Sequence, residues 1–301
     1  MLLRRKKELE ASPFFERETI SLKSRLQEHH IRPNIIAEFK RKSPSKGFIN
    51  EHVLPEVIMG YETQGAVGIS ILTDEHFFGG SCNDFLAGRR VSTRTSLLRK
   101  EFIVDEFQII ESKSIGADVI LLIASMLTPS DISYLSRCAK MLNLDVLLEV
   151  HTKSEIETSP LDYVDIIGVN NRDLKTFTVS LETSFSLSEH IPPTCVKISE
   201  SGIHDASDIP FTTCFCVTVV NGTDKMIGQL TTRESTVYVG INLSSSKACM
   251  SEHFLNFSQS RTGFDVCGLI SLTMPARLAE SRTILKKDIR ESGPPRKLRK
   301  R

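Results

Sequence analysis

The sequence has no long apolar run, no excess of either charge and no paired-cysteine motif. No segment of the 301 residues approaches the roughly 20 apolar residues that a helix needs to cross a bilayer, so no membrane span is predicted. The 38 Lys and Arg residues against 37 Asp and Glu give a formal net charge of +1. Near-neutrality argues against bulk attraction to nucleic acid or to an anionic membrane.

The seven cysteines are scattered, and none forms a CxxC pair. That usage suits a reducing cytoplasm and predicts neither a disulfide framework nor a zinc site. Residues 1–10 are basic but lack the apolar stretch of a secretory signal, which again predicts a cytoplasmic location.

Short apolar runs rich in Ile, Leu and Val recur along the first two thirds of the chain. They are continuous rather than alternating, which is typical of strands buried on both faces of a parallel sheet. The runs are 35–39, 67–72, 97–98 with 102–104, 119–123, 146–150, 164–169 and 196–199.

Helix signals lie between these runs. Polar residues that favour helix N-termini stand at Ser81, Asp105, Thr128 and Thr152. No GxGxxG motif follows the first run, which disfavours a dinucleotide-binding sheet. Seven strand–helix units before residue 210 predict an α/β fold of the (βα)8 TIM-barrel type, irregular or incomplete at its eighth strand.

Three regions are expected. Residues 1–34 form a helical N-terminal extension, residues 35–211 supply strands 1–7 of the barrel, and residues 212–301 form an aberrant C-terminal segment. Within that last segment, 215–220 is β-branched and is a candidate substitute strand. A poorly structured basic tail is expected after it.

Polar residues follow the predicted strands where the strands end. Each charge alone reads most simply as a solvated rim residue. In a barrel, however, the carboxyl ends of all strands meet at one mouth, so these groups would converge and perturb one another's pKa values. The charged residues concerned are Glu38, Lys40, Lys100, Glu149 and Glu200.

Five segments resemble the indole-3-glycerol-phosphate synthase family, in the same order and at similar spacing. Together they extend the resemblance over about residues 10–210. The segments are Ile36–Ser45, Leu98–Ile103, Leu148–His151, Gly168–Leu174 and Ser199–Ile203.

The resemblance implies an enzyme of tryptophan biosynthesis, a carboxy-lyase that needs neither cofactor nor metal. Its reaction would close 1-(2-carboxyphenylamino)-1-deoxyribulose 5-phosphate into indole-3-glycerol phosphate, with release of carbon dioxide and water. The implied ligand is therefore a small sugar phosphate, not nucleic acid or a membrane, and other enzymes of the pathway are candidate partners.

The resemblance also implies roles for individual residues. Lys100 matches the general acid of ring closure, and Lys40 a lysine that holds the substrate's carboxylate. Glu149 and Glu38 match carboxylates that take or relay protons. The acid and base roles of Lys40, Glu38 and Glu149 stay open.

Further residues match the family's substrate-binding positions. Asn170 and Glu200 would orient hydroxyls, and Arg172 would lie near the anthranilate end. Phe78, Phe102 and Leu121 match the apolar walls of the family's substrate site, and each is equally consistent with an ordinary core residue. Phosphate is expected at Ser43, Ser201 and Gly202, since a glycine allows close approach of the backbone.

The chain departs from the family at both ends. Phe14, Phe15 and Arg17 are expected to keep part of an N-terminal lid over the pocket. After residue 211 the βα pattern stops. Gly222 then reads either as a makeshift phosphate half-site or, preferably, as part of an Asn-Gly turn.

Residues 212–301 suggest a shifted reading frame or a misjoined gene, because the pattern is lost in the middle of an element. The leading alternative to an active synthase is therefore an impaired phosphate-binding barrel remnant. An isomerase barrel of the same pathway is disfavoured by the two lysines. An interaction protein acting through the basic residues 296–301 is the least favoured alternative.

Overall fold

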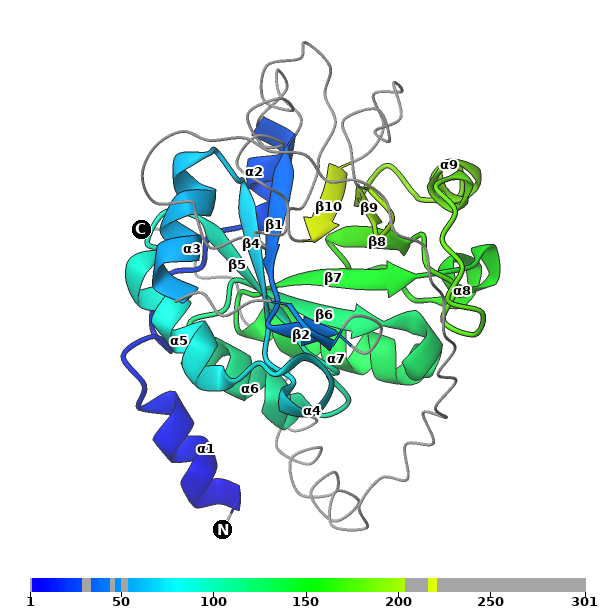
Figure 1. The fold of residues 1–301 in the computed structure, drawn as a ribbon. Coiled ribbons are helices and arrows are strands. Elements are labelled where there is room, and N and C mark those ends of the chain that lie inside the picture. The colour runs from blue at the N-terminus through cyan, green and yellow to red at the C-terminus, as the bar shows by residue number, and fades with distance from the viewer. Residues whose placement is uncertain (1, 29–33, 44–46, 50–53, 204–215, 221–301) are drawn as a thin grey trace, which may run out of the picture.

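The protein is described by a computed structural model, in which residues 2–28, 34–43, 47–49, 54–203 and 216–220 are placed well enough to describe. Eight parallel strands form a closed barrel, and helices surround it (Figure 1). The barrel strands are β1 (Ile35–Phe39), β4 (Gly68–Leu72), β5 (Ser96–Lys100), β6 (Val119–Ile123), β7 (Asp145–Val150), β8 (Ile166–Asn170), β9 (Val196–Glu200) and β10 (Cys216–Val220).

The predicted (βα)8 barrel is confirmed, and its eighth strand lies within the segment 215–220. β10 pairs in parallel with β1 on one side and with β9 on the other, so the sheet has no open edge. A barrel left open at this point is therefore not what the described residues form, and the alternative of a barrel remnant is not favoured.

The connections between strands carry the helices. They are α3 (Leu54–Thr63), α4 (Glu75–Phe78), α5 (Cys82–Val91), α6 (Glu106–Ser114), η1 (Ala124–Met126), α7 (Pro129–Met141), α8 (Lys153–Thr158) and α9 (Glu182–Ser188). A small antiparallel pair, β2 (Lys42–Ser43) and β3 (Gly47–Phe48), follows β1. No helix in the described part of the chain has the length and apolarity that a membrane span requires.

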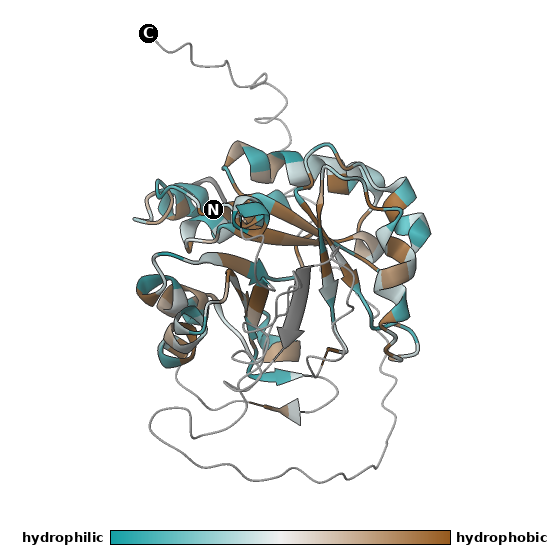
Figure 2. Cartoon of the chain, turned by 90° about the horizontal axis from the view of Figure 1, so that it is seen from above, coloured by the Kyte–Doolittle hydropathy of each residue, from teal (hydrophilic) through white to brown (hydrophobic). Residues whose placement is uncertain are grey.

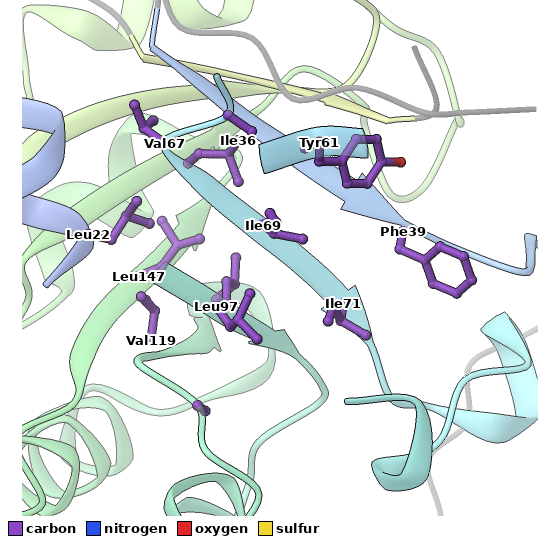
Figure 3. Close-up of a cluster of buried hydrophobic side chains, with 14 of the residues drawn as sticks. Leu22, Ile36, Phe39, Tyr61, Val67, Ile69, Ile71, Leu97, Val119 and Leu147 are labelled. Carbon is purple, nitrogen blue, oxygen red and sulfur yellow. The ribbon is translucent and has the colours of Figure 1, made fainter. Parts of the chain in front are cut away.

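Alternation along the strands separates two layers of core. In β6, Leu121 belongs to the cluster shared with β1 and β4, whereas Ile120 and Leu122 pack with residues of α7. Figure 3 shows part of the first cluster, with side chains from β1, β4, β5, β6 and β7 gathered together. Strands are mostly hydrophobic and outer helix faces hydrophilic (Figure 2).

The third strand differs from its expected extent. β5 ends at Lys100, and Phe102–Val104, which the apolar pattern added to it, lie in the loop before α6. Gln108 holds this loop: its Nε2 donates to the Phe102 carbonyl (2.8 Å), and its Oε1 accepts from the backbone of Val104 and Asp105. Of the apolar residues there, only Ile103 is buried, and it packs against residues of β6 and α7, whereas Phe102 and Val104 are partly exposed.

The N-terminal segment contains α1 (Leu2–Glu10), which packs against α6, and α2 (Leu22–Glu28). Between them, Arg17 pairs with Asp118, and the backbone N–H of Ile20 donates to the same carboxylate (2.8 Å). Asp118 directly precedes β6 and so lies at the amino ends of the strands. Arg17 therefore binds beneath the barrel, whereas the sequence analysis expected it in a lid over the mouth.

Candidate active site

A ring of charged side chains lies at the carboxyl ends of the strands. Alternation turns every second residue inward, so Glu38 of β1, Lys100 of β5, Glu149 of β7 and Glu200 of β9 all point into the barrel. These residues come from segments up to 162 positions apart in the chain, and the barrel closure brings them together.

Lys100 is the centre of this ring. Its Nζ lies 2.6 Å from Glu200 Oε2, 3.4 Å from Glu38 Oε2 and 3.9 Å from Glu149 Oε2. Burial opposes the charged form of Lys100, but the three carboxylates outweigh it and raise its pKa well above the ordinary value. The three carboxylates therefore favour the ammonium form of the side chain.

Lys40 is the second cation of the site. Its Nζ lies 3.3 Å from Glu38 Oε1 and 6.0 Å from the centre of the Phe78 ring. Burial lowers the pKa of Lys40, and Glu38 only partly compensates. The two lysines thus differ: Lys40 gives up its proton more readily than Lys100.

The three glutamates are buried but differ in their partners. Burial raises the pKa of Glu38, but Lys100 and Lys40 reverse the effect and leave it lowered. Glu149 accepts a hydrogen bond from Asn170 Nδ2 (2.9 Å) and faces His151 and Lys100, which together lower its pKa to about 2. Glu200 has a raised pKa because burial and the neighbouring Glu149 outweigh Lys100.

Gly168 makes room for Glu200. A Cβ atom at this position of β8 would lie 2.4 Å from Glu200 Oε1 and 3.2 Å from Leu147 Cδ1. This one inward position of β8 thus carries no side chain, and the neighbouring carboxyl group lies over it.

An aromatic cluster flanks the cations. The rings of Phe78 and Phe102 have centroids 6.3 Å apart, and Phe77 meets Phe102 edge-on at the same centroid distance. Leu121 lies deeper: it is in register with Leu147, whereas Ile123 is in register with Glu149. Ile123 is therefore the apolar neighbour at the level of the carboxylates.

The remaining predicted residues lie around the mouth. The backbone N–H of Arg172 donates to Asn170 Oδ1 (3.0 Å), which ties it to the ring. Ser201 and Gly202 follow Glu200 in a left-handed turn with φ of 68° and 80°. Ser43 lies in β2, three residues after Lys40. Gly222 lies outside the described residues.

Asn171 supports the Ser201 turn. Its Nδ2 donates to Ser199 Oγ (2.9 Å) and to the Ser201 carbonyl (3.1 Å), while its Oδ1 accepts from Ser184. A Cβ at Gly202 would meet Val179 Cγ1 at 2.3 Å, so only glycine fits there. Nothing in the described residues groups three His, Cys, Asp or Glu side chains in a way that could hold a metal ion.

Ser70 and His151 were missed by the sequence analysis. Ser70 Oγ donates to Glu38 Oε2 (3.3 Å), because β4 places it in register with Glu38. His151 lies 3.5 Å from Glu149. Alternation along the strands could have predicted both positions. Ser70 stands two residues before Leu72 in β4, and His151 stands two residues after Glu149 of β7.

The family model described as indole-3-glycerol phosphate synthase matches residues 3–226, which is more than half of the chain. The chain belongs to the indole-3-glycerol phosphate synthase family. Family membership confirms the resemblance drawn from the five segments.

Curated relatives of that name give the same result. The chain is 45% identical to one from Bacteroides thetaiotaomicron over 172 residues, which cover 57% of this chain and 65% of the relative. It is 42% identical to those from Polynucleobacter asymbioticus (58% and 66% covered) and Bacillus velezensis (64% and 77% covered). The chain thus spans about two thirds of the length of the first two relatives.

Proposed function

We propose that this member of the synthase family catalyses the ring closure of 1-(2-carboxyphenylamino)-1-deoxyribulose 5-phosphate to indole-3-glycerol phosphate. The observation that carries the proposal is the Lys100 ammonium surrounded by Glu38, Glu149 and Glu200 within 3.9 Å at the mouth of the barrel. An acid–base reaction in several steps needs such a cluster of groups with unlike proton affinities.

The first step forms a carbon–carbon bond. The aryl carbon that bears the carboxylate attacks the ribulose carbonyl, whose oxygen gains negative charge and then a proton. Lys100 stabilises the developing charge as an ammonium ion and, as the general acid, gives that oxygen its proton; the neutral amine then takes a proton back before the next turnover. Lys40 holds the carboxylate until the bond to the ring breaks and carbon dioxide leaves.

The second step removes water. The hydroxyl group leaves with a proton, while a base takes a proton from the adjacent ring carbon and the new ring becomes aromatic. We assign Glu149 as the base, because it is a carboxylate of the ring that Asn170 and His151 hold in place opposite Lys100. Glu38, which lies between Lys40 and Lys100, relays a proton to the leaving hydroxyl, while Glu200 orients the substrate's hydroxyl groups.

The remaining residues bind and orient the substrate. Phe78 and Phe102 hold the aromatic ring, with Leu121 below them, and Arg172 lies toward the anthranilate carboxylate. Asn170 orients a hydroxyl group, and Ser43, Ser201 and Gly202 hold the phosphate. The left-handed conformation of Ser201 and Gly202 supports this last assignment, since successive backbone N–H groups in such turns form anion-binding sites.

We also propose a cytoplasmic location, where the unpaired thiols of Cys82, Cys138 and Cys195 would stay reduced. Other enzymes of tryptophan synthesis would be its partners, as suppliers of the substrate and consumers of the product. Fractionation of cells followed by immunodetection tests the location, and co-purification from the same fraction tests the partners.

Turnover of the Lys100→Ala variant tests the function. Indole fluorescence on mixing enzyme with substrate should fall by about 10²-fold or more, with substrate binding retained. Lys140→Ala is the matched control, because Lys140 also pairs with two aspartates, Asp145 and Asp165, but outside the mouth. Equal activity of the Lys100→Ala and Lys140→Ala variants, or binding without turnover in the unmutated chain, would contradict the proposal.

A further inference from the structure

His151 lies directly behind the ring of catalytic candidates. Its imidazole is 9% exposed and stands between two carboxylates: Nε2 is 3.5 Å from Glu149 Oε1, and Nδ1 is 3.5 Å from Glu155 Oε2. At this distance and orientation both contacts are ion pairs rather than hydrogen bonds. Glu149 faces the pocket, and Glu155 belongs to α8.

The first turn of α8 fixes this arrangement. Thr152 is the N-cap residue, and its Oγ1 accepts from the Glu155 N–H (3.2 Å). Glu155 Oε2 in turn accepts from the backbone N–H of His151 (2.6 Å). The cap fixes the backbone of Glu155, and the bond from the His151 N–H holds its carboxylate beside the imidazole.

Two of the three glutamates around Lys100, Glu200 and Glu149, have unequal support. Glu200 is closer to Lys100, but its Oε1 has no hydrogen-bond partner among the described residues. Glu149 is farther from Lys100, at 3.9 Å, yet it has Asn170 and His151 on its other oxygen. The second cation is what distinguishes Glu149 from Glu200.

The charged groups facing the imidazole come from three elements: Glu149 from β7, Glu155 from α8, and Lys100 from β5 beyond Glu149. Asn170 of β8 is neutral. Burial lowers the pKa of His151, but the two carboxylates more than reverse this and raise it to about 9. The ring is therefore cationic at neutral pH.

We propose that His151 is a positioning residue that holds Glu149 in its ionised form, and that the α8 cap supports it through Glu155. Glu200 has no second cation of this kind within ion-pair distance among the described residues. The role of His151 in the reaction rests on the proposed function, in which Glu149 is the base. The ion pairs themselves stand independently of that function.

The pH dependence of turnover tests the proposal on the whole chain. In the His151→Gln variant, which keeps an amide donor but loses the charge, Glu149 should protonate more easily. The acid limb of kcat/KM should then move up by one pH unit or more, a loss of about tenfold on the acid side, with little change at pH 8. Glu155→Gln should shift the limb in the same direction by less.

His190→Gln is the matched control, because His190 also pairs with a glutamate, Glu189 at 3.6 Å, but on the surface. The acid limb of kcat/KM in the His190→Gln variant should coincide with that of the unmutated enzyme. An acid limb that stays in place in both His151→Gln and Glu155→Gln overturns the proposal.

Nuclear magnetic resonance of the histidine rings gives a readout without turnover. The signal lost in His151→Gln should titrate near pH 9 in the unmutated protein and at lower pH in Glu155→Gln. A ring that titrates below pH 7 in the unmutated protein overturns the proposal, even if His151→Gln fails to fold. If the chain lacks ring-closure activity but His151 titrates near pH 9, only the proposed function fails.

Discussion

At the scale of single residues, the site depends on one inward position of β8 that carries no side chain. Changing Gly168 to Ala would place a methyl group 2.4 Å from Glu200 Oε1, so the carboxyl group must leave its position beside Lys100. We expect kcat to fall by about tenfold or more, since one displaced group of a preorganised site has effects of this size. Steady-state kinetics with the fluorescent product measure the loss.

Gly60→Ala is the control for this substitution. Gly60 lies in α3, and nothing within 4 Å meets an added Cβ there. Its activity should stay unchanged, and the helix should gain about 0.5–1 kcal/mol of stability. Full activity in Gly168→Ala would show that Glu200 does not need its observed place.

His151 also makes the stability of the fold depend on pH. Its pKa is about 9 in the folded protein and near 6.5 in the unfolded chain, so its contribution is fully present below pH 6.5 and disappears as the pH rises toward 9. The free energy of unfolding should therefore decline between pH 6.5 and 9. Urea unfolding across this range should show a smaller decline in His151→Gln, whereas an unchanged decline would exclude His151 as its source.

Residue types at strand ends predicted most of the charged ring. Glu38 and Glu149 stand out because a charge between buried apolar residues is rare, and Lys40 and Lys100 because they lie at strand ends. Ser70 gave a weaker signal, since a serine among Ile69 and Ile71 is unremarkable until the register places it beside Glu38. Pairing across strands, rather than sequence, decides that contact.

At the scale of elements, the cap of α6 controls the position of the aromatic wall. Gln108 accepts from the N–H groups of Val104 and Asp105, and it donates to the Phe102 carbonyl. Gln108→Ala should lower stability by about 1–2 kcal/mol and raise KM several-fold, because Phe102 loses its anchor. Urea unfolding and substrate titration measure the two effects.

Thr128→Ala separates the two effects. Thr128 caps α7 by accepting from the Asp131 N–H (3.2 Å) and does not touch the aromatic cluster. It should lose about 1 kcal/mol of stability with KM unchanged. If both variants raise KM equally, the position of Phe102 is not the cause.

Helix starts could be read well from the sequence, and short elements could not. The capping residues Ser81, Asp105, Thr128 and Thr152 all accept backbone N–H groups as expected, because a cap is a local interaction. The β2–β3 pair and α4 escaped notice, since two to four residues carry no periodicity. The loop at 102–104 was predicted as strand, because an apolar run alone does not distinguish a strand from a loop.

At the scale of the whole molecule, eight strands must close before the charged ring can form. Glu38 and Glu200 lie on β1 and β9, the two strands that flank and pair with β10. The loss of helix pattern after residue 211 made closure uncertain from sequence. Backbone pairing tolerates an unusual strand sequence, which is why β-branched residues at 216–220 suffice.

Truncation tests this dependence. A chain ending at residue 203 lacks β10, so β1 and β9 would become open edges with unpaired backbone groups and the barrel would be prone to aggregate. A chain ending at residue 226 keeps every strand and the whole family match. Circular dichroism should show one cooperative thermal transition for residues 1–226 and none for residues 1–203. A cooperative transition in the shorter chain would show that seven strands hold the fold, and a 1–226 chain that fails to fold would show that the barrel needs residues beyond 226.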